Sequence, residues 1–249
     1  MKMKTILFTL LTLFLIFSPA GIKAQADASA ILRKMDDVML AVKDKTVTVK
    51  MVMLNLKSQK EKVKEATLTQ KGSAMKLFRY TAPSSDAGIA TLTLPNREVY
   101  LYLPMFKKPK KITNLAESSA INKSDFSIEE LAIKPYSDVY TPTLLSSDNG
   151  IFALDLITTD DDIAVKHIVV HINKEHYYPE QFDFYDKNDQ LVKKSVYHHI
   201  EVNGFWVADT VSMENLKKSH KTTLYMTDIK INQGLKDELF TVENMVVTD

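Results

Sequence analysis

The sequence predicts a mainly β protein, built as one wide, curved antiparallel sheet of about eleven strands. Apolar and polar residues alternate over most of the chain, which is the period of a strand with one buried face. Short turn signals separate these segments, so consecutive strands are expected to pair as neighbours. Helical signals are confined to 26–42, 125–131 and a single turn at 237–240. No repeat, low-complexity tract or linker interrupts the pattern, and we expect a single domain.

The N-terminus has the pattern of a secretory signal peptide. Lys2 and Lys4 precede an uninterrupted apolar run at 5–17, which is short for a membrane span, and Ala24-Gln25-Ala26 supplies a small-x-small cleavage pattern. We expect residues 1–24 to be removed, although cleavage after residue 26 fits the pattern equally well. Residues 25–249 would then form the domain. An uncleaved N-terminal anchor is the alternative.

The charge balance excludes one class of function. The signal peptide holds three of the 32 basic residues and none of the 31 acidic ones, so its removal leaves 29 basic and 31 acidic residues. A bulk nucleic-acid binder would be strongly basic. The chain has no cysteine, so neither a disulfide nor a lipid-modified cysteine can form. We expect a soluble exported protein that packing alone holds together.

The first element is an amphipathic helix within 26–42. Its apolar face comprises Ile31, Leu32, Met35, Val38, Met39 and Val42. Strands of a first meander are expected at 46–58, 62–70, 74–80, 88–94 and 97–103, and strands of a second at 151–157, 163–173, 180–186, 190–202, 205–214 and 222–232. Asp148-Asn149-Gly150 precedes the second set, and Asn203-Gly204 predicts a tight hairpin within it.

A short helix is expected between the two meanders. Ser127 and Glu130 form a capping box, and Phe126 and Leu131 are placed to form a hydrophobic staple. Pro135 would end this helix. Another helical turn is expected at 237–240, where it would close the domain.

The sequence offers no catalytic constellation. His167 and His171 are four residues apart, which in a strand separates them by about 13 Å and prevents them from sharing one metal ion. His198 and His199 should point to opposite faces of their strand. The acidic stretch 160–162 lacks the spacing of a calcium loop. We therefore predict no catalytic residue, no metal site and no cofactor, so that the protein is not an enzyme.

Several strands carry apolar residues on both faces. In 46–58, Val47, Val49, Met51 and Met53 occupy one face and Val52, Leu54 and Leu56 the other. Such strands need cover on both sides, from helices or from a ligand. Methionine and aromatic side chains suit an adaptable apolar cavity, and few helices are predicted to cover the sheet. An ordinary filled core beneath the helices is the alternative.

Strand 97–103 runs into a basic cluster, Lys107, Lys108, Lys110 and Lys111, around Pro109. The cluster could lie at the rim of a cavity and meet anionic headgroups or an acidic partner. It could equally be a solubilising loop at a sheet edge.

Four stretches together resemble the LolA-like family of outer-membrane lipoprotein-sorting proteins. They are LFRYTAPSSDAGIATL, YLYLPMFKKPKKITN, KSDFSIEEL and the closing segment GFWVADTVSMENLKKSHKTTLYMTDIKINQGLKDELFT. The resemblance spans about residues 30 to 245. It implies a half-closed, open antiparallel β-barrel whose concave apolar face is lidded by a few short helices.

The resemblance also implies a function. The protein would be a monomeric periplasmic carrier that holds acyl chains of lipoproteins or lipids, takes them from an inner-membrane donor and passes them to an outer-membrane acceptor, with transient contact with the membrane surface. The alternatives are a non-catalytic accessory subunit of an envelope export system, with a filled core, and a secreted hydrolase.

We expect the residues of such a carrier to divide into four groups. The cavity wall would comprise Val49, Met51, Met53, Phe78, Leu92, Leu101 and Tyr102, and the lid Met35, Met39, Phe126 and Leu131. Arg79 is the candidate for a latch on the lid. Lys107, Lys108, Lys110 and Lys111 would form the rim that meets headgroups or a partner.

Overall fold

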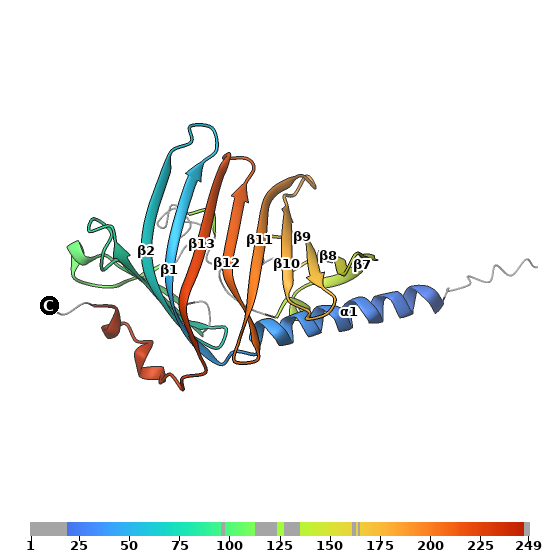
Figure 1. The fold of residues 1–249 in the computed structure, drawn as a ribbon, viewed down its shortest axis with the longest axis horizontal. Coiled ribbons are helices and arrows are strands. Elements are labelled where there is room, and N and C mark those ends of the chain that lie inside the picture. The colour runs from blue at the N-terminus through green and yellow to red at the C-terminus, as the bar shows by residue number, and fades with distance from the viewer. Residues whose placement is uncertain are drawn as a thin grey trace, which may run out of the picture.

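The computed structural model describes residues 19–95, 98–112, 124–126, 135–160, 163 and 165–246, with side chains from residue 27 onward. In this part of the chain, thirteen strands form one open antiparallel sheet, and one α-helix lies across one face of it (Figure 1). The predicted fold class, a mainly β half-closed sheet, is confirmed. None of the helices in these ranges is long and apolar enough to span a membrane.

The sheet consists of two meanders joined side by side. Its strand order is β6-β5-β4-β3-β2-β1-β13-β12-β11-β10-β9-β8-β7. The first meander comprises β1 (Asp44–Asn55), β2 (Glu61–Lys71), β3 (Met75–Ala82), β4 (Ala90–Leu94), β5 (Glu98–Tyr102) and β6 (Lys110–Ile112). The second comprises β7 (Thr141–Asp148), β8 (Ile151–Ile157), β9 (His167–Asn173), β10 (Pro179–Tyr185), β11 (Leu191–Val202), β12 (Phe205–Asn215) and β13 (His220–Ile231). Because β1 pairs with both β2 and β13, one continuous surface crosses from one meander to the other.

The prediction of about eleven strands omits β6 and β7, which are the two edges of the described sheet. β6 is only three residues long, contains two of the basic-cluster lysines and follows Pro109. β7 contains Pro142 and ends in Ser146-Ser147-Asp148. An edge strand has one partner and tolerates proline, charge and short length, so the alternating signal is weak at both edges.

The two predicted glycine turns are confirmed by the backbone. Asn203 and Gly204 have φ angles of 50° and 82°, and Asn149 and Gly150 have angles of 48° and 79°. Two successive positive φ angles are typical of the tight turn that matches the twist of a hairpin. These turns set the register of β11 with β12 and of β7 with β8.

The helix α1 (Pro19–Leu40) packs its apolar face against β7 and β12. Leu32 and Met35 are fully buried while Arg33 and Asp37 are exposed, as the predicted amphipathic pattern requires. The helix begins earlier than predicted and runs through the expected cleavage sites at 24 and 26. Residues 1–18 of the expected signal peptide lie outside the described residues.

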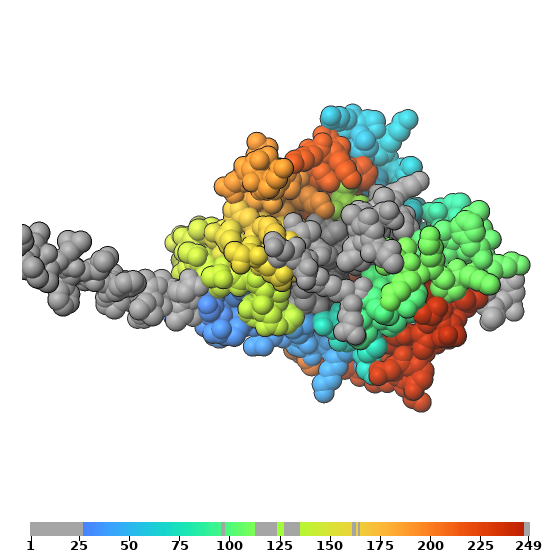
Figure 2. Space-filling model, turned by 180° about the vertical axis from the view of Figure 1, so that it is seen from behind, coloured from blue at the N-terminus to red at the C-terminus, as the bar shows by residue number. Residues whose placement is uncertain are grey.

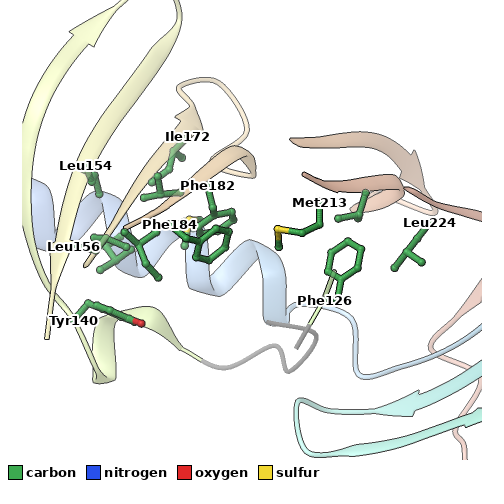
Figure 3. Packing of buried hydrophobic residues seen from close by; sticks show 14 of the residues in the cluster. Phe126, Tyr140, Leu154, Leu156, Ile172, Phe182, Phe184, Met213 and Leu224 are labelled. Atoms are coloured by element: carbon green, nitrogen blue, oxygen red, sulfur yellow. The ribbon is translucent and has the colours of Figure 1, made fainter. Parts of the chain in front are cut away.

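The buried side chains form two clusters on opposite faces of the sheet. The larger lies between α1 and the face of the sheet that carries Val49 and Met51, here called the concave face. Figure 3 shows Phe182 and Phe184 of this cluster beside α1. The smaller cluster lies on the other, convex face, where Leu92 and Tyr102 pack against Phe240 and Met245. The C-terminal segment therefore covers part of the convex face, as the red segment beside the green strands shows in Figure 2.

The predicted helical turn near the C-terminus is confirmed as the 3₁₀ helix η4 (Asp237–Leu239). The predicted capping-box helix cannot be placed in the same way, because Ser127, Glu130 and Leu131 lie outside the described residues. Of the residues expected at its start, Asp125 and Phe126 are described, and both are buried.

Candidate functional site: an apolar cavity with a cationic end

The concave face encloses a cavity of about 210 Å³. Its wall is the sheet from β4 through β1 to β11, and its cover includes the end of α1, Phe126 and Tyr136. Most of the lining is apolar. The apolar side chains on the sheet are Val49, Met51, Leu68, Phe78, Trp206, Val207, Ala208, Val211, Leu224 and Met226.

Five of the predicted cavity and lid residues line this space: Val49, Met51 and Phe78 in the wall, and Met39 and Phe126 in the cover. The structure places Met53 and Met35 in the same buried cluster without exposing them to the cavity. Leu131 lies outside the described residues.

Leu92 and Tyr102 face away from the cavity, contrary to the expected wall. Leu92 lies between Thr91 and Thr93, which line the cavity, and the alternation of a strand turns it to the convex face. Tyr102 pairs with Ala90 and shares that convex face, whereas Leu101 pairs with Thr91 and is buried on the concave face. Adjacent residues of β5 thus lie on opposite faces of the sheet, so Leu101 and Tyr102 cannot both line the cavity.

Arg79 also lies on the convex face, because its neighbour Phe78 faces the cavity. Its guanidinium group donates hydrogen bonds to the carbonyl oxygens of Asn244, at 2.8 Å, and Met245, at 3.0 Å. The expected latch on the lid is thus corrected: Arg79 holds the C-terminal segment to the back of the sheet.

The cover is fastened at Asp125 instead. The Asp125 carboxylate lies 2.5 Å from His220 Nδ1 and accepts a hydrogen bond from the Thr222 hydroxyl at 2.8 Å. Lys193 Nζ donates to the Asp125 carbonyl oxygen at 3.0 Å. These contacts hold Phe126 between Met213 and Leu224 (Figure 3).

A second polar contact joins the helix to the rest of the cover. The buried Asp36 carboxylate accepts hydrogen bonds from the N–H groups of Tyr136 and Ser137, both at 2.8 Å. Burial raises the pKa of Asp36 above its ordinary value, against the opposing effect of these hydrogen bonds. The 3₁₀ helix η3 (Tyr136–Asp138) is thereby held to α1, with Tyr136 over the cavity.

One end of the cavity is polar and cationic. Lys45 on β1 pairs with Gln70 on β2, Gln70 pairs with Lys76 on β3, and Lys76 pairs with Thr93 on β4. Directly opposed residues share a face, and all four line the cavity. The next residues along the same face of β1 and β3 are apolar, so the polar row borders an apolar chamber.

The cations of this row lie in an environment that opposes their charge. Burial lowers the pKa of Lys45, and burial together with the charge of Lys45 lowers the pKa of Lys76 to about 7. Across the cavity, burial lowers the pKa of His199 to about 4, and the nearby Lys45 contributes in the same direction. His199 is therefore neutral at pH 7, and the positive charge of this end comes from the two lysines, of which Lys76 is only partly protonated.

Aromatic rings form the wall beside His199. The His199 ring stacks on Tyr178 with centroids 4.4 Å apart, and Tyr178 lies 5.2 Å from Trp206. His198, the preceding residue, bonds Asp209 at 2.6 Å and is largely exposed. The prediction that these two histidines point to opposite faces is confirmed.

The four lysines of the basic cluster follow an exposed apolar tip in the chain. Met105 and Phe106, in the 3₁₀ helix η2 (Pro104–Phe106), are 80% and 65% exposed, and Lys107, Lys108 and Lys110 follow them with exposed side chains. Lys111 differs because it forms an ion pair with Glu98. The cluster lies at the β6 edge of the sheet, away from the cavity lining.

The sequence analysis missed Lys45, Lys76, His199 and Trp206 as cavity residues. A usable signal was present, because Lys45 shares strand parity with Val47 and Val49, and Lys76 with Phe78. A lysine continuing an apolar face marks either the end of that face or a buried charge. Within the described ranges, no three histidine, aspartate or glutamate side chains gather in a group able to hold a metal ion.

Comparisons with known proteins agree with this architecture. A family model described only as “-like: Uncharacterized protein” matches residues 72–246, more than half of the chain. No curated protein matches the sequence. A solved structure described as an outer membrane lipoprotein-sorting protein domain, from Vibrio parahaemolyticus, is 23% identical, with a TM-score of 0.80 over 90% of this chain and 100% of that chain.

Two further solved structures have the same fold. A LolA superfamily protein from Nitrosomonas europaea is 22% identical, with a TM-score of 0.71 over 86% of this chain and 97% of that chain. A DUF1329 family protein from Desulfovibrio piger is 18% identical, with a TM-score of 0.80 over 89% and 99% of the two chains. The chain therefore belongs to the family that this family model describes, and it has the same fold as an outer membrane lipoprotein-sorting protein domain and a LolA superfamily protein.

Proposed function

We propose that the protein is a non-catalytic, monomeric carrier of the periplasm that binds acyl chains of lipoproteins or lipids beneath its cover. A signal peptide at residues 1–24 would direct export and would be removed in the mature protein. The observation that carries the proposal is the partly open, mainly apolar cavity between a continuous sheet and a cover that Asp36 and Asp125 hold in place. An inner-membrane donor would load it and an outer-membrane acceptor would unload it.

The energetics suit reversible transfer. Burying an acyl chain contributes about 0.8 kcal/mol for each methylene, so a chain of moderate length binds firmly and can still be passed on. The cavity of about 210 Å³ is smaller than the roughly 300–1,000 Å³ of sites for larger ligands. A long chain would therefore require the cover to move outward as it enters.

The sole tryptophan provides a direct test, because Trp206 lines the cavity. A fatty acid brominated along its chain should quench Trp206 fluorescence saturably, and unlabelled fatty acid should reverse the quenching. Native mass spectrometry of protein purified from its own periplasm should reveal bound lipid. A bare chain in that experiment, together with no quenching, would rule the carrier out.

Filling the cavity should block binding without unfolding the protein. Ala208 lines the cavity, and Ala208→Phe would direct a ring into it. We expect at least a tenfold loss of acyl-chain affinity, while the stability changes by less than the roughly 1–3 kcal/mol typical of overpacking a filled core. Fluorescence titration and thermal melting measure the two effects.

The control is Val196→Phe, an exposed position on β11 beside the cavity residue Tyr197. This change adds the same ring on the convex side and should leave affinity within about twofold. Equal losses from both variants would show that the cavity is not the binding site.

The exposed tip at β5–β6 is proposed to meet the anionic surface of a membrane. Each lysine near such a surface contributes about 1 kcal/mol, and Met105 and Phe106 add apolar contact. Replacing both Met105 and Phe106 with serine should lower binding to vesicles containing anionic lipid by about tenfold or more. Vesicle sedimentation at two salt concentrations separates the apolar contribution to vesicle binding from the electrostatic contribution.

Two matched variants test whether position matters. Leu145→Ser removes an apolar side chain that is 56% exposed on β7, the opposite edge of the described sheet, and should leave vesicle binding unchanged. Lys111→Gln should weaken binding less than Lys108→Gln, because Lys111 is already paired with Glu98. If all these variants bind alike, the basic cluster only protects a sheet edge.

A further inference from the structure

We propose that the cavity selects amphiphiles with an anionic headgroup, which Lys45 and Lys76 bind at its polar end. The inference rests on the proposed carrier function and specifies its cargo. The ligand class is a single apolar chain that ends in a carboxylate or a phosphate. Both groups present several negatively charged oxygens, which are the acceptors that ammonium groups prefer.

The geometry places the two lysines on one face of the sheet, with backbones close enough for both side chains to reach a shared anion. Lys45 and Lys76 flank Gln70 in a single cross-strand row, so their backbones are two strand spacings apart, about 10 Å. Both side chains are long and both line the cavity. A headgroup above Gln70 is within reach of each, while the attached chain lies along Leu68, Phe78 and Val49.

The ammonium group of Lys45 has no hydrogen-bond or ion-pair partner among the described residues. Asp44 is the only carboxylate among the described residues that line the cavity, and it is already engaged. Its oxygens accept hydrogen bonds from the N–H groups of Gln233, Gly234 and Leu235 at 2.6, 2.9 and 3.2 Å. The charge of Lys45 is thus not neutralised by Asp44, the acid next to it in sequence.

A second polar atom at this end also lacks a partner. His199 Nδ1 is buried and has no hydrogen-bond partner among the described residues, and the charge of Lys45 acts on this ring. Buried polar atoms are nearly always paired, so this end of the cavity holds polar groups whose hydrogen bonding is incomplete.

A filled apolar core would not require the charge of Lys45. Keeping the Lys45 ammonium group without a partner in an apolar wall is unfavourable unless a ligand supplies the opposite charge. On the convex side of the same strand, Lys50 is exposed to solvent and carries no such cost. The difference between Lys45 and Lys50 therefore makes a matched experiment.

The test compares three probes with the same twelve-carbon chain: laurate, dodecyl phosphate and dodecanol, each below its aggregation concentration. Trp206 fluorescence reports occupancy, and inorganic phosphate is the control without a chain. The wild type should bind laurate or dodecyl phosphate about tenfold to a hundredfold more tightly than dodecanol. Lys45→Met and Lys76→Met should each remove most of this preference, whereas Lys50→Met should retain it.

Dodecanol binding also shows that each variant is folded, because this probe needs only the apolar chamber. Preference for laurate alone or for dodecyl phosphate alone would support the proposal and identify the headgroup. Equal affinity for all three probes, or equal losses for all three in the lysine variants, would overturn it and leave the carrier function intact. Failure of every probe to bind the wild type would instead overturn the carrier function itself.

A proton measurement separates headgroup binding from a structural role. Lys76 has a pKa of about 7 beside Lys45, and the other titratable groups described in the cavity lining are His199, Asp44, Tyr136 and Tyr197. An anion bound there raises the pKa of Lys76, so laurate binding at pH 7.5 should take up protons while dodecanol binding should not. Calorimetry in two buffers of different ionisation enthalpy measures this uptake, and its absence with laurate would contradict the proposal.

Discussion

Replacing Lys45 with methionine should raise the free energy of unfolding by about 1 to 4 kcal/mol at pH 7, even though this residue is proposed to bind the ligand. Burial lowers the pKa of Lys45, which means that folding disfavours its charged form. Methionine has a similar length and fills the same space without a charge. Denaturant unfolding of the ligand-free protein measures the difference.

The sign of the pH dependence follows from the direction of the shift. Because the pKa of Lys45 is lower in the folded chain, the unfolded chain binds more protons in the range below the ordinary value of 10.5. The wild type should therefore gain stability as pH rises towards 10.5, and its deficit relative to Lys45→Met should shrink. Lys76 acts in the same sense between pH 7 and 10.5.

The control is again Lys50→Met on the same strand. Its exposed side chain should change stability by no more than about 0.5 kcal/mol, with no added pH dependence. If Lys45→Met destabilised the protein as strongly as the loss of a buried ion pair, the lysine would have a structural partner and the argument for a ligand would fail.

The fold could be predicted largely from the sequence because its signals are local. The alternation of strands, the Asn203-Gly204 turn and the amphipathic face of α1 each depend on residues close together in the chain. The edge strands β6 and β7 escaped the prediction because edges relax the pattern on which it relied. Alternation within a strand was also sufficient to separate His198 from His199.

The site was harder to predict because it depends on register between strands. The row of Lys45, Gln70 and Lys76 exists only when β1, β2 and β3 pair in one particular alignment. A shift of one residue would turn a strand's side chains to the other face. The same limit explains Leu92 and Tyr102, whose common face is convex, and Arg79, whose partners are 165 and 166 residues away. The sequence showed which of these residues are apolar, but it did not show which face of the sheet each one occupies.

Removing the Asp125 carboxylate should loosen the cover while leaving the sheet intact. Asp125→Ala deletes the contacts with His220 and Thr222, which lie 95 and 97 residues further along the chain. Hydrogen bonds to a charged group contribute about 1.5–3 kcal/mol, so the segment at 124–126 should open about tenfold to a hundredfold more often. Amide exchange at these residues would report this opening.

Faster opening of the segment at 124–126 should change the rates of ligand binding and release only if this segment covers the entrance to the cavity. Phe126 lies over the cavity, so ligand entry requires it to move if the cover is the gate. Stopped-flow quenching of Trp206 by a brominated fatty acid should then show faster association and faster release in Asp125→Ala. Asp138→Ala, which removes an exposed carboxylate from η3, should change neither rate.

An unchanged association rate together with lower stability would assign Asp125 a structural role and place the entrance elsewhere. Faster binding and faster release of ligand would instead show that the contacts of Asp125 with His220 and Thr222 control loading and unloading. In that case the sheet provides the binding energy and the contact of Asp125 with β13 sets how quickly cargo passes. A carrier needs its affinity and its opening rate to be set independently. High affinity protects the acyl chain in transit, whereas a sufficient opening rate allows the chain to be delivered.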